Sequence, residues 1–114
     1  MSQIKMGRWI TPPGASTSNS LELGTDTLLG IYTPPAMDAT QLKVQASADG
    51  VAFVDILDIG APLIVTAEAE AYLALDPLKS MGARHIRLAH LDSTGSAVTE
   101  SEERTFAPVF RSFQ

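Results

Sequence analysis

The chain has 114 residues, of which 45% are apolar and 18% charged, and its formal net charge is −5. This length supports one folded domain with a single core, and the composition excludes a wholly disordered chain. The eight Lys and Arg residues are scattered, which excludes nucleic acid as the main partner because phosphate binding needs clustered cations.

The chain contains no cysteine, which excludes disulfides, thiolate metal ligands and thiol catalysis. The first nine residues lack an apolar stretch of signal-peptide length. No apolar run approaches the roughly 20 residues that span a bilayer. We therefore expect no membrane partner and a protein that folds in the cytoplasm where it is made.

Residues 1–20 differ in composition from the rest. Pro12, Pro13 and Gly14 precede a Ser/Thr/Asn-rich tract, which favours local turns over strand pairing. The segment is predicted to be an extended N-terminal arm outside a domain of residues 21–114, with a disordered terminus as the alternative. A solvated tail rarely carries large apolar side chains. The arm is therefore predicted to order on a partner, and its partner-binding residues are Ile4, Met6, Trp9 and Ile10.

Short apolar runs separated by turn residues follow. Residues 28–33 are predicted to form a strand that stops at Pro34 and Pro35. The clearest signal is a hairpin of residues 41–47 and 51–57, which alternate between apolar and polar side chains around Asp49-Gly50. Asp-Gly favours a tight hairpin turn because both residues tolerate positive φ.

The second half of the chain continues this pattern. Strands are predicted over 63–66, 71–75, 83–91 and 104–113. Asp76 and Pro77 suit the N-cap and first position of one helical turn over 76–81. Pro108 lies inside the last strand, which indicates a sheet edge or a bulge. The result is an all-β chain with seven or eight short strands, typical of an antiparallel β-sandwich or jelly roll.

The alternation also predicts which side chains form the core. Val51 and Phe53 compete with Val54 and Ile56 for the inner face of the second hairpin strand, since a slip of one residue exchanges the faces. The predicted core consists of Leu29, Ile31, Leu42, Val44, Val54, Ile56, Leu73, Leu75, Ile86, Leu88, Phe106 and Phe110.

The chain offers no recognisable catalytic, cofactor or metal site. His85 and His90 lie five residues apart in one predicted strand, so they face opposite ways and share no metal. The Gly-x-Ser-x-Gly turn of many hydrolases is absent, as are Gly-rich phosphate loops. The carboxylates of Glu100, Glu102 and Glu103 are predicted to be a solvated guard of a sheet edge.

Two arginines on one strand require partners. Arg84 and Arg87 fall on opposite faces, and the inward one is predicted to form an ion pair or to anchor an interface. The candidate partners are Asp49, Asp55 and Asp76. Most aromatic residues fall in predicted strands and are expected in the core, which disfavours an aromatic platform for sugars.

Two segments resemble a known class of sandwich. Residues 47–53 (SADGVAF) resemble the hairpin of galactose-binding-like, discoidin-type β-sandwiches, and residues 83–88 (ARHIRL) resemble their Ala-Arg-x-hydrophobic-Arg-hydrophobic strand. In a chain of this size the same pair resembles accessory virion proteins of tailed bacteriophages. Residues 29–34 and 72–77 share that likeness, which spans roughly residues 28–111.

The resemblance implies a non-enzymatic virion protein that decorates or cements a phage capsid. Its expected partners are the major capsid protein or other virion subunits, and copies of itself in a homo-oligomer. Its expected location is the outer capsid surface, after assembly in the host cytoplasm. A carbohydrate-binding module and a tail or neck fitting are the alternatives. The apical aromatic, Arg and His residues of discoidin-type lectins have no counterpart here, which disfavours sugar binding.

Overall fold

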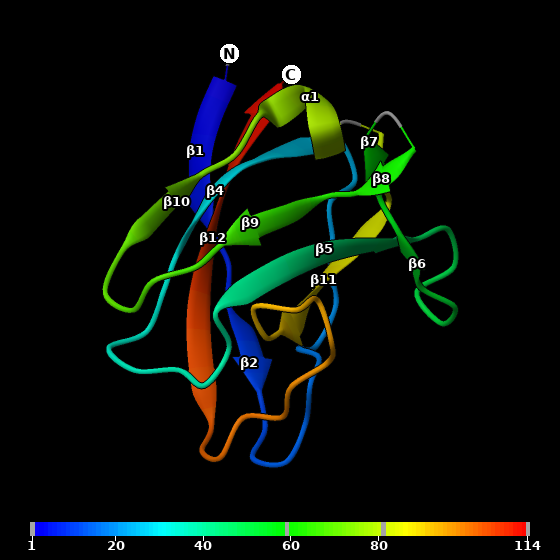
Figure 1. Ribbon diagram of the computed structural model, residues 1–114. Coiled ribbons are helices and arrows are strands. Elements are labelled where there is room, and N and C mark those ends of the chain that lie inside the picture. The colour runs from blue at the N-terminus through cyan, green and yellow to red at the C-terminus, as the bar shows by residue number, and fades with distance from the viewer. Residues whose placement is uncertain (1, 59, 81, 114) are drawn as a thin grey trace.

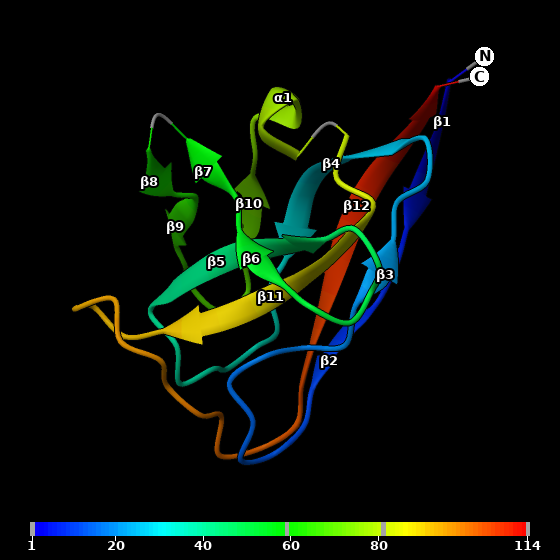
Figure 2. The ribbon, with the colours of Figure 1, turned by 90° about the vertical axis from the view of Figure 1, so that its right-hand side faces the viewer.

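Two antiparallel sheets pack against each other in the computed structural model, which describes residues 2–58, 60–80 and 82–113 (Figures 1 and 2). The predicted antiparallel β-sandwich is confirmed. The described residues form twelve strands, four of them only two residues long. This exceeds the predicted seven or eight because three segments within residues 2–22 also form strands and because residues 54–62 contain three short strands.

The first sheet, called the β12 sheet, is built around the long C-terminal strand. Its strands run in the order β1-β12-β4-β10, and β2 pairs with β12 beyond β1. Their bounds are β1 (Ser2–Met6), β2 (Trp9–Thr11), β4 (Asp26–Tyr32), β10 (Tyr72–Ala74) and β12 (Arg104–Phe113).

The second sheet, called the β11 sheet, lies across the first. Its order is β3-β11-β5-β6, and β9 also pairs with β5. A small separate hairpin joins β7 to β8, and a single helical turn, α1, follows β10. The bounds are β3 (Leu21–Glu22), β5 (Gln41–Ser47), β6 (Val54–Asp55), β7 (Leu57–Asp58), β8 (Ala61–Pro62), β9 (Ile64–Thr66), β11 (His85–Leu91) and α1 (Pro77–Ser80).

The core lies between the two sheets. Alternate residues of each long strand point inward, as the two-residue period requires. The His90 ring meets the Phe106 ring edge to face across the layers, with centroids 5.4 Å apart. The buried apolar cluster comprises Trp9, Leu23, Leu28, Ile31, Ala39, Leu42, Val44, Ala67, Ile86, Leu88, Phe106 and Phe110.

A β-bulge corrects part of the predicted core. Val109 of β12 pairs with Gly30, but the next residue, Phe110, pairs with Leu28, so Leu29 is an extra residue in β4. Strict alternation placed Leu29 beside Ile31 in the core. The bulge instead turns Leu28 inward and leaves Leu29 half-buried.

Three other predicted core positions are half-buried against the cluster, and one is exposed. Ile56, Leu73 and Leu75 pack against the core from its margin. Val54 is wrong as a core residue, because its side chain is 66% exposed. It pairs with Ala46 on the outermost strand of the β11 sheet, where no further strand covers it in the described part of the chain.

The central hairpin is confirmed, with a wider turn than predicted. Strand β6 pairs with β5 only at Val54 and Asp55, so residues 48–53 form a loop. Only Gly50 of the Asp-Gly pair has a positive φ, of 81°. Asp49 instead folds the loop by accepting hydrogen bonds from the backbone N–H groups of Val51 and Ala52. These bonds lower the pKa of Asp49 to about 2.

Residues 2–11 belong to the β12 sheet, which corrects the predicted separation between an arm and the sandwich. β1 pairs with β12 from Ser2 to Met6, and β2 pairs with it from Trp9 to Thr11. The Trp9 side chain is fully buried in the core. Pro12 and Pro13 therefore end a strand rather than mark an arm.

The predictions for Asp76 and Pro108 fare differently. The Asp76 carboxylate accepts a hydrogen bond from the Leu78 N–H, so it caps α1 as predicted. Pro108 lies in a central strand and not at a sheet edge, so of the two predicted alternatives the bulge is the one found, at Val109 and Phe110. Pro108 falls beside the break between β1 and β2, where the Gly7 N–H donates to its carbonyl, and it directly precedes the bulge.

Candidate functional site

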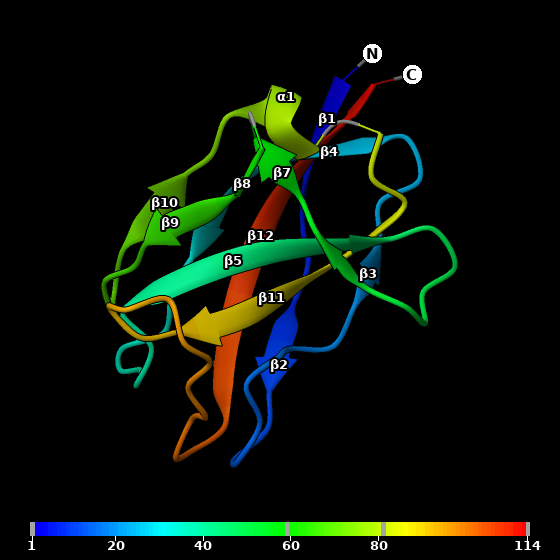
Figure 3. The same ribbon diagram turned by 45° about the vertical axis from the view of Figure 1, so that its right-hand side comes forward.

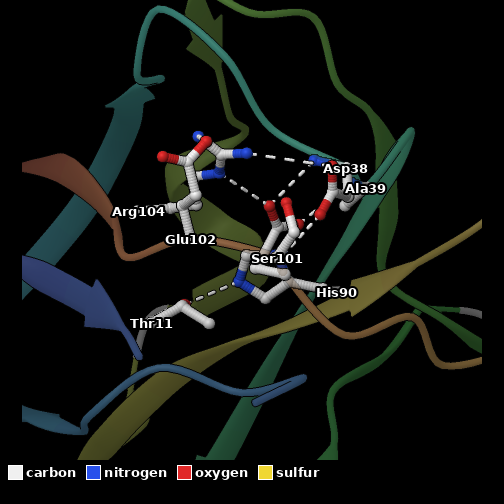
Figure 4. A network of polar contacts seen from close by, with 8 residues as sticks. Thr11, Asp38, Ala39, His90, Ser101, Glu102 and Arg104 are labelled. Atoms are coloured by element: carbon white, nitrogen blue, oxygen red, sulfur yellow. Dashed lines mark hydrogen bonds and ion pairs between the residues drawn. The ribbon is translucent and has the colours of Figure 1, made fainter. Parts of the chain in front are cut away.

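A cluster of polar side chains lies buried between the sheets (Figure 4). Thr11 from β2 and His90 from β11 meet with Oγ1 and Nε2 2.7 Å apart. The other ring nitrogen of His90, Nδ1, lies 3.0 Å from Oε2 of Glu100, in the loop before β12. None of these three side chains is exposed to solvent.

Glu100 is the centre of the cluster. Its carboxylate accepts hydrogen bonds from the backbone N–H groups of Asp38 at 2.8 Å and Ala39 at 2.9 Å. It also pairs with the Arg104 guanidinium at 3.0 Å. The glutamate therefore ties the loop before β5 and the loop before β12 to the core.

Backbone bonds reinforce this link at the end of the sandwich away from the termini. The Gly14 N–H donates to the Glu100 carbonyl, and the Glu100 N–H donates to the Ala15 carbonyl. Figure 3 shows the loop after β2 lying beside the loop before β12.

The electrostatics define the protonation state of the cluster. Burial tends to raise the pKa of Glu100, but its N–H donors, Arg104 and His90 outweigh burial, and the net pKa lies below the ordinary value. Burial lowers the pKa of His90, against the pull of Glu100. Glu100 is thus ionised and only accepts, so a neutral His90 donates from Nδ1 and accepts the Thr11 hydroxyl at Nε2.

The order hydroxyl, imidazole, carboxylate is also that of a hydrolase triad. A triad needs its hydroxyl at a surface where substrate arrives. Thr11 is fully buried in this conformation, so its hydroxyl does not reach such a surface.

The cluster corrects one prediction and confirms another. Glu100 is not part of a solvated edge guard, although the Glu102 side chain is 78% exposed. His85 and His90 do face opposite ways, and His85 is half-buried beside Gly50. His90 has the same parity as Ile86 and Leu88, which was a signal in the sequence that its ring points into the core.

A second feature is the outer face of the β12 sheet, the side turned away from the core. Strand register places Ile4, Arg111 and Thr27 in one row across it, Met6, Val109 and Gly30 in the next, and Ala107, Tyr32 and Tyr72 in the third. Four of its large side chains are exposed, at 53%, 63%, 48% and 44%. This apolar face is defined as Ile4, Met6, Tyr32 and Tyr72.

Gly30 shapes the apolar face. A Cβ at this position would clash with the ring and hydroxyl of Tyr72 and with the Leu73 carbonyl. The Tyr72 side chain therefore lies across the glycine and close to the sheet. It meets Tyr32 with ring centroids 4.7 Å apart and a tilt of 47°.

The four predicted partner-binding residues divide between surface and core. Ile4 and Met6 lie on the apolar face, and Ile10 is half-buried on the same side of the sheet, opposite Thr105. Trp9 is fully buried in the core, so its side chain is not part of this face. Tyr32 and Tyr72 lie outside the predicted core, but sequence reasoning did not include them among the partner-binding residues.

The outer face of the β11 sheet is polar. Lys43 pairs with Asp55 at 3.1 Å, and Gln45 bonds to Asp55 as well. Arg87 donates from Nε to Gln45 and lies over the Phe53 ring at 4.3 Å from its centroid. Asp55, one of the carboxylates predicted to pair with an arginine, is thus bound by Lys43.

A shallow hollow opens at the edge of the same sheet. Its volume is about 390 Å³, and mostly small side chains line it. The lining residues are Ala46, Ser47, Ala48, Val54, Gly82, Ala83 and Arg84. The described residues contain no group of three or more His, Asp or Glu side chains placed to hold a metal ion. They also contain no helix long and apolar enough to cross a membrane.

Among solved structures, the following chain shares the fold over nearly the whole length. It is the crystal structure of the SPBc2 prophage-derived protein YomS, with a TM-score of 0.57, 10% sequence identity and 96% of each chain covered. No family model matches the sequence. No curated protein matches it either.

Proposed function

We propose that this chain is a non-enzymatic structural protein of a bacteriophage particle. It decorates or cements the capsid, or serves at the neck or tail, through contacts with other virion subunits and with copies of itself. Its working place is then the virion, after assembly in the host cytoplasm.

The observation that carries the proposal is the apolar face. Four large apolar or aromatic side chains stay exposed on one side of the β12 sheet, whereas the conspicuous polar groups are buried and internally paired. Exposed clusters of this kind typically mark contact surfaces with other macromolecules. The fold shared with a prophage-derived protein over 96% of both chains supports a phage origin.

The first test is whether the protein is part of a particle. Particles are purified by density gradient from an induced host that carries the gene, and are probed for the chain. We expect the chain in the particle fraction at a constant ratio to the major capsid protein. A chain that stays at the top of the gradient contradicts the proposal.

The second test concerns the apolar face. Deletion of residues 1–12 is unsuitable, because it would remove Trp9 from the core. Met6→Lys should keep the fold, because the Met6 side chain is 63% exposed, and it places a charge on the face. Leu78→Lys, at a 72% exposed position on α1, is the matched control. Particles lacking the protein should bind the control and lose affinity for Met6→Lys, and equal binding by both variants contradicts this role of the face.

A second candidate function, carbohydrate binding, is favoured by the Tyr32–Tyr72 pair. Two half-exposed rings in contact offer the aromatic surface on which sugar rings stack. A glycan array with the wild type and Tyr72→Ala tests it. A hit that disappears in the variant supports sugar binding, and an array without hits removes it.

A further inference from the structure

The strand β1 forms a free edge of the β12 sheet. It pairs with β12 on one side, in an unbroken register from Ser2 to Met6, and with no strand on the other within the described residues. Such an edge presents unpaired N–H and C=O groups that accept a further strand. We propose that β1 of a second copy of this chain pairs there, antiparallel, about a two-fold axis at Ile4.

The pattern of β1 is complementary to itself about Ile4. An axis at this residue sets Ile4 opposite Ile4 of the second copy, position 3 opposite Lys5, and position 2 opposite Met6. Opposed residues of an antiparallel pair share a face, so the outer apolar face of one copy continues into that of the other. An axis moved to lie between residues 4 and 5 would set Ile4 against Lys5 and join unlike faces.

The local charge at this edge does not oppose a second copy. Two chains of net charge −5 repel each other at a distance, so they associate where charge is locally compensated. Lysine on an edge strand usually prevents pairing. Here the Lys5 ammonium lies 3.3 Å from Asp26 of its own chain, so the charge of this lysine is balanced within the chain.

This pairing of two copies extends the proposed function. It rests on that proposal because both treat the apolar face as a contact surface. One sheet would run from β10 through β1 and then through the same strands of the second copy in reverse order. A five-residue strand pair is smaller than a standard interface of about 1,600 Å², so the dimer should be weak and concentration-dependent. A symmetric particle compensates by repeating the contact.

Cross-linking tests the register directly, because the chain has no native cysteine. Opposed residues of an antiparallel pair have Cα atoms about 4.5–5.5 Å apart, within the range of about 4.4–6.8 Å that a disulfide requires. Full-length Ile4→Cys should oxidise to a disulfide-linked dimer. Leu78→Cys, on the exposed helical turn, is the control. Cross-linking of Ile4→Cys no faster than the control overturns the proposal.

Charge reversal provides a second measurement. Ile4 is half-exposed on an edge strand, so Ile4→Lys and Ile4→Glu should fold, as circular dichroism can verify. In sedimentation velocity each variant alone should be monomeric, because like charges meet at the axis. Their equimolar mixture should dimerise. A monomeric wild type at every accessible concentration, or variants that dimerise as the wild type does, overturns the proposal.

The outcomes separate this inference from the proposed function. A wild type that cross-links and dimerises through Ile4 but is absent from particles supports the pairing and contradicts the virion role. A wild type present in particles, but without dimer or cross-link, contradicts the pairing alone.

Discussion

The buried polar cluster and the apolar face both depart from the usual distribution of side chains, in opposite senses. Glu100, His90 and Thr11 are charged or polar and fully buried, whereas Met6 and Tyr32 are large, apolar or aromatic, and exposed. The cluster finds its partners within the chain. The apolar face has no such cover, which is why it directs attention to other molecules.

This contrast makes the two regions experimentally separable. Changes in the cluster should alter the stability of the fold and leave association intact. Changes on the apolar face should do the reverse. A cluster variant that weakens association, or an apolar-face variant that lowers stability, would show that the two regions are coupled.

The largest expected effect comes from Glu100→Ala. It removes the acceptor of His90 Nδ1, of two backbone N–H groups and of Arg104 Nε, and the other carboxylates near Arg104 lie farther away, at 3.8 Å. Breaking a buried ion pair costs about 3–5 kcal/mol. Urea unfolding should therefore show a loss of this size. The control, Glu102→Ala, removes an exposed carboxylate that also lies near Arg104 and should change stability by less than about 0.5 kcal/mol.

The next effect concerns the apolar face. The double variant Met6→Lys with Tyr32→Lys should lower affinity for particles by roughly 100-fold, as loss of about 2–3 kcal/mol from contact residues implies. Its unfolding free energy should stay within about 1 kcal/mol of the wild type, because both side chains are exposed. Particle co-sedimentation and urea unfolding measure the two quantities. If the variant unfolded at low urea, the apolar face would also contribute to stability, and the two regions would not be separable.

A smaller effect follows from Thr11→Val, which keeps the shape of the side chain and removes its hydroxyl. His90 Nε2 then lacks its partner, at a cost of about 1–3 kcal/mol. Thr11→Ser keeps the hydroxyl and loses only a methyl group. If Thr11→Ser loses stability and Thr11→Val does not, packing of the methyl group rather than the hydrogen bond is what Thr11 supplies.

The smallest effect is a dependence on pH. The folded pKa values of His90 and Glu100 both lie below the ordinary values of 6.5 and 4.5, mainly because burial opposes a charged imidazole and because N–H donors and cations hold the carboxylate ionised. The unfolded chain then binds more protons in acid, so stability falls as the pH drops below 6.5 and falls further below 4.5. Urea midpoints at pH 7.5 and 5.5 measure the first step, which His90→Gln should abolish. A midpoint that rises in acid would contradict it.

Local patterns in the sequence predicted the fold class because strand alternation and helix capping involve residues that are close together in the chain. The alternation of β5 and β11 and the cap of α1 all involve residues within a few positions of one another. The bulge at Leu29 escaped prediction because it depends on the register of β4 against β12, which lies far away in the chain. The surplus residue has no local signature.

The buried cluster escaped prediction for the same reason. Thr11 and His90 are 79 positions apart, and Asp38 and Glu100 are 62 apart. The parity of His90 indicated that its ring points inward. No nearby residue pattern indicated which carboxylate would accept its hydrogen bond. For the N-terminal segment, composition suggested an arm. The strand pairing of β1 and β2 outweighed the turn preference of the Pro/Ser tract that follows them.

The pairing of β1 with β12 has a mechanical consequence. Ser2 lies opposite Phe113, so the first and last strands are adjacent and antiparallel, and both ends emerge together (Figure 1). A pulling force between these two ends would act across the strands and open their hydrogen bonds one pair at a time, from the end inward. The molecule should resist tension poorly between its ends. A mechanically firm attachment of this protein to another molecule would instead have to use the broad face of the sheet, where many contacts share the force.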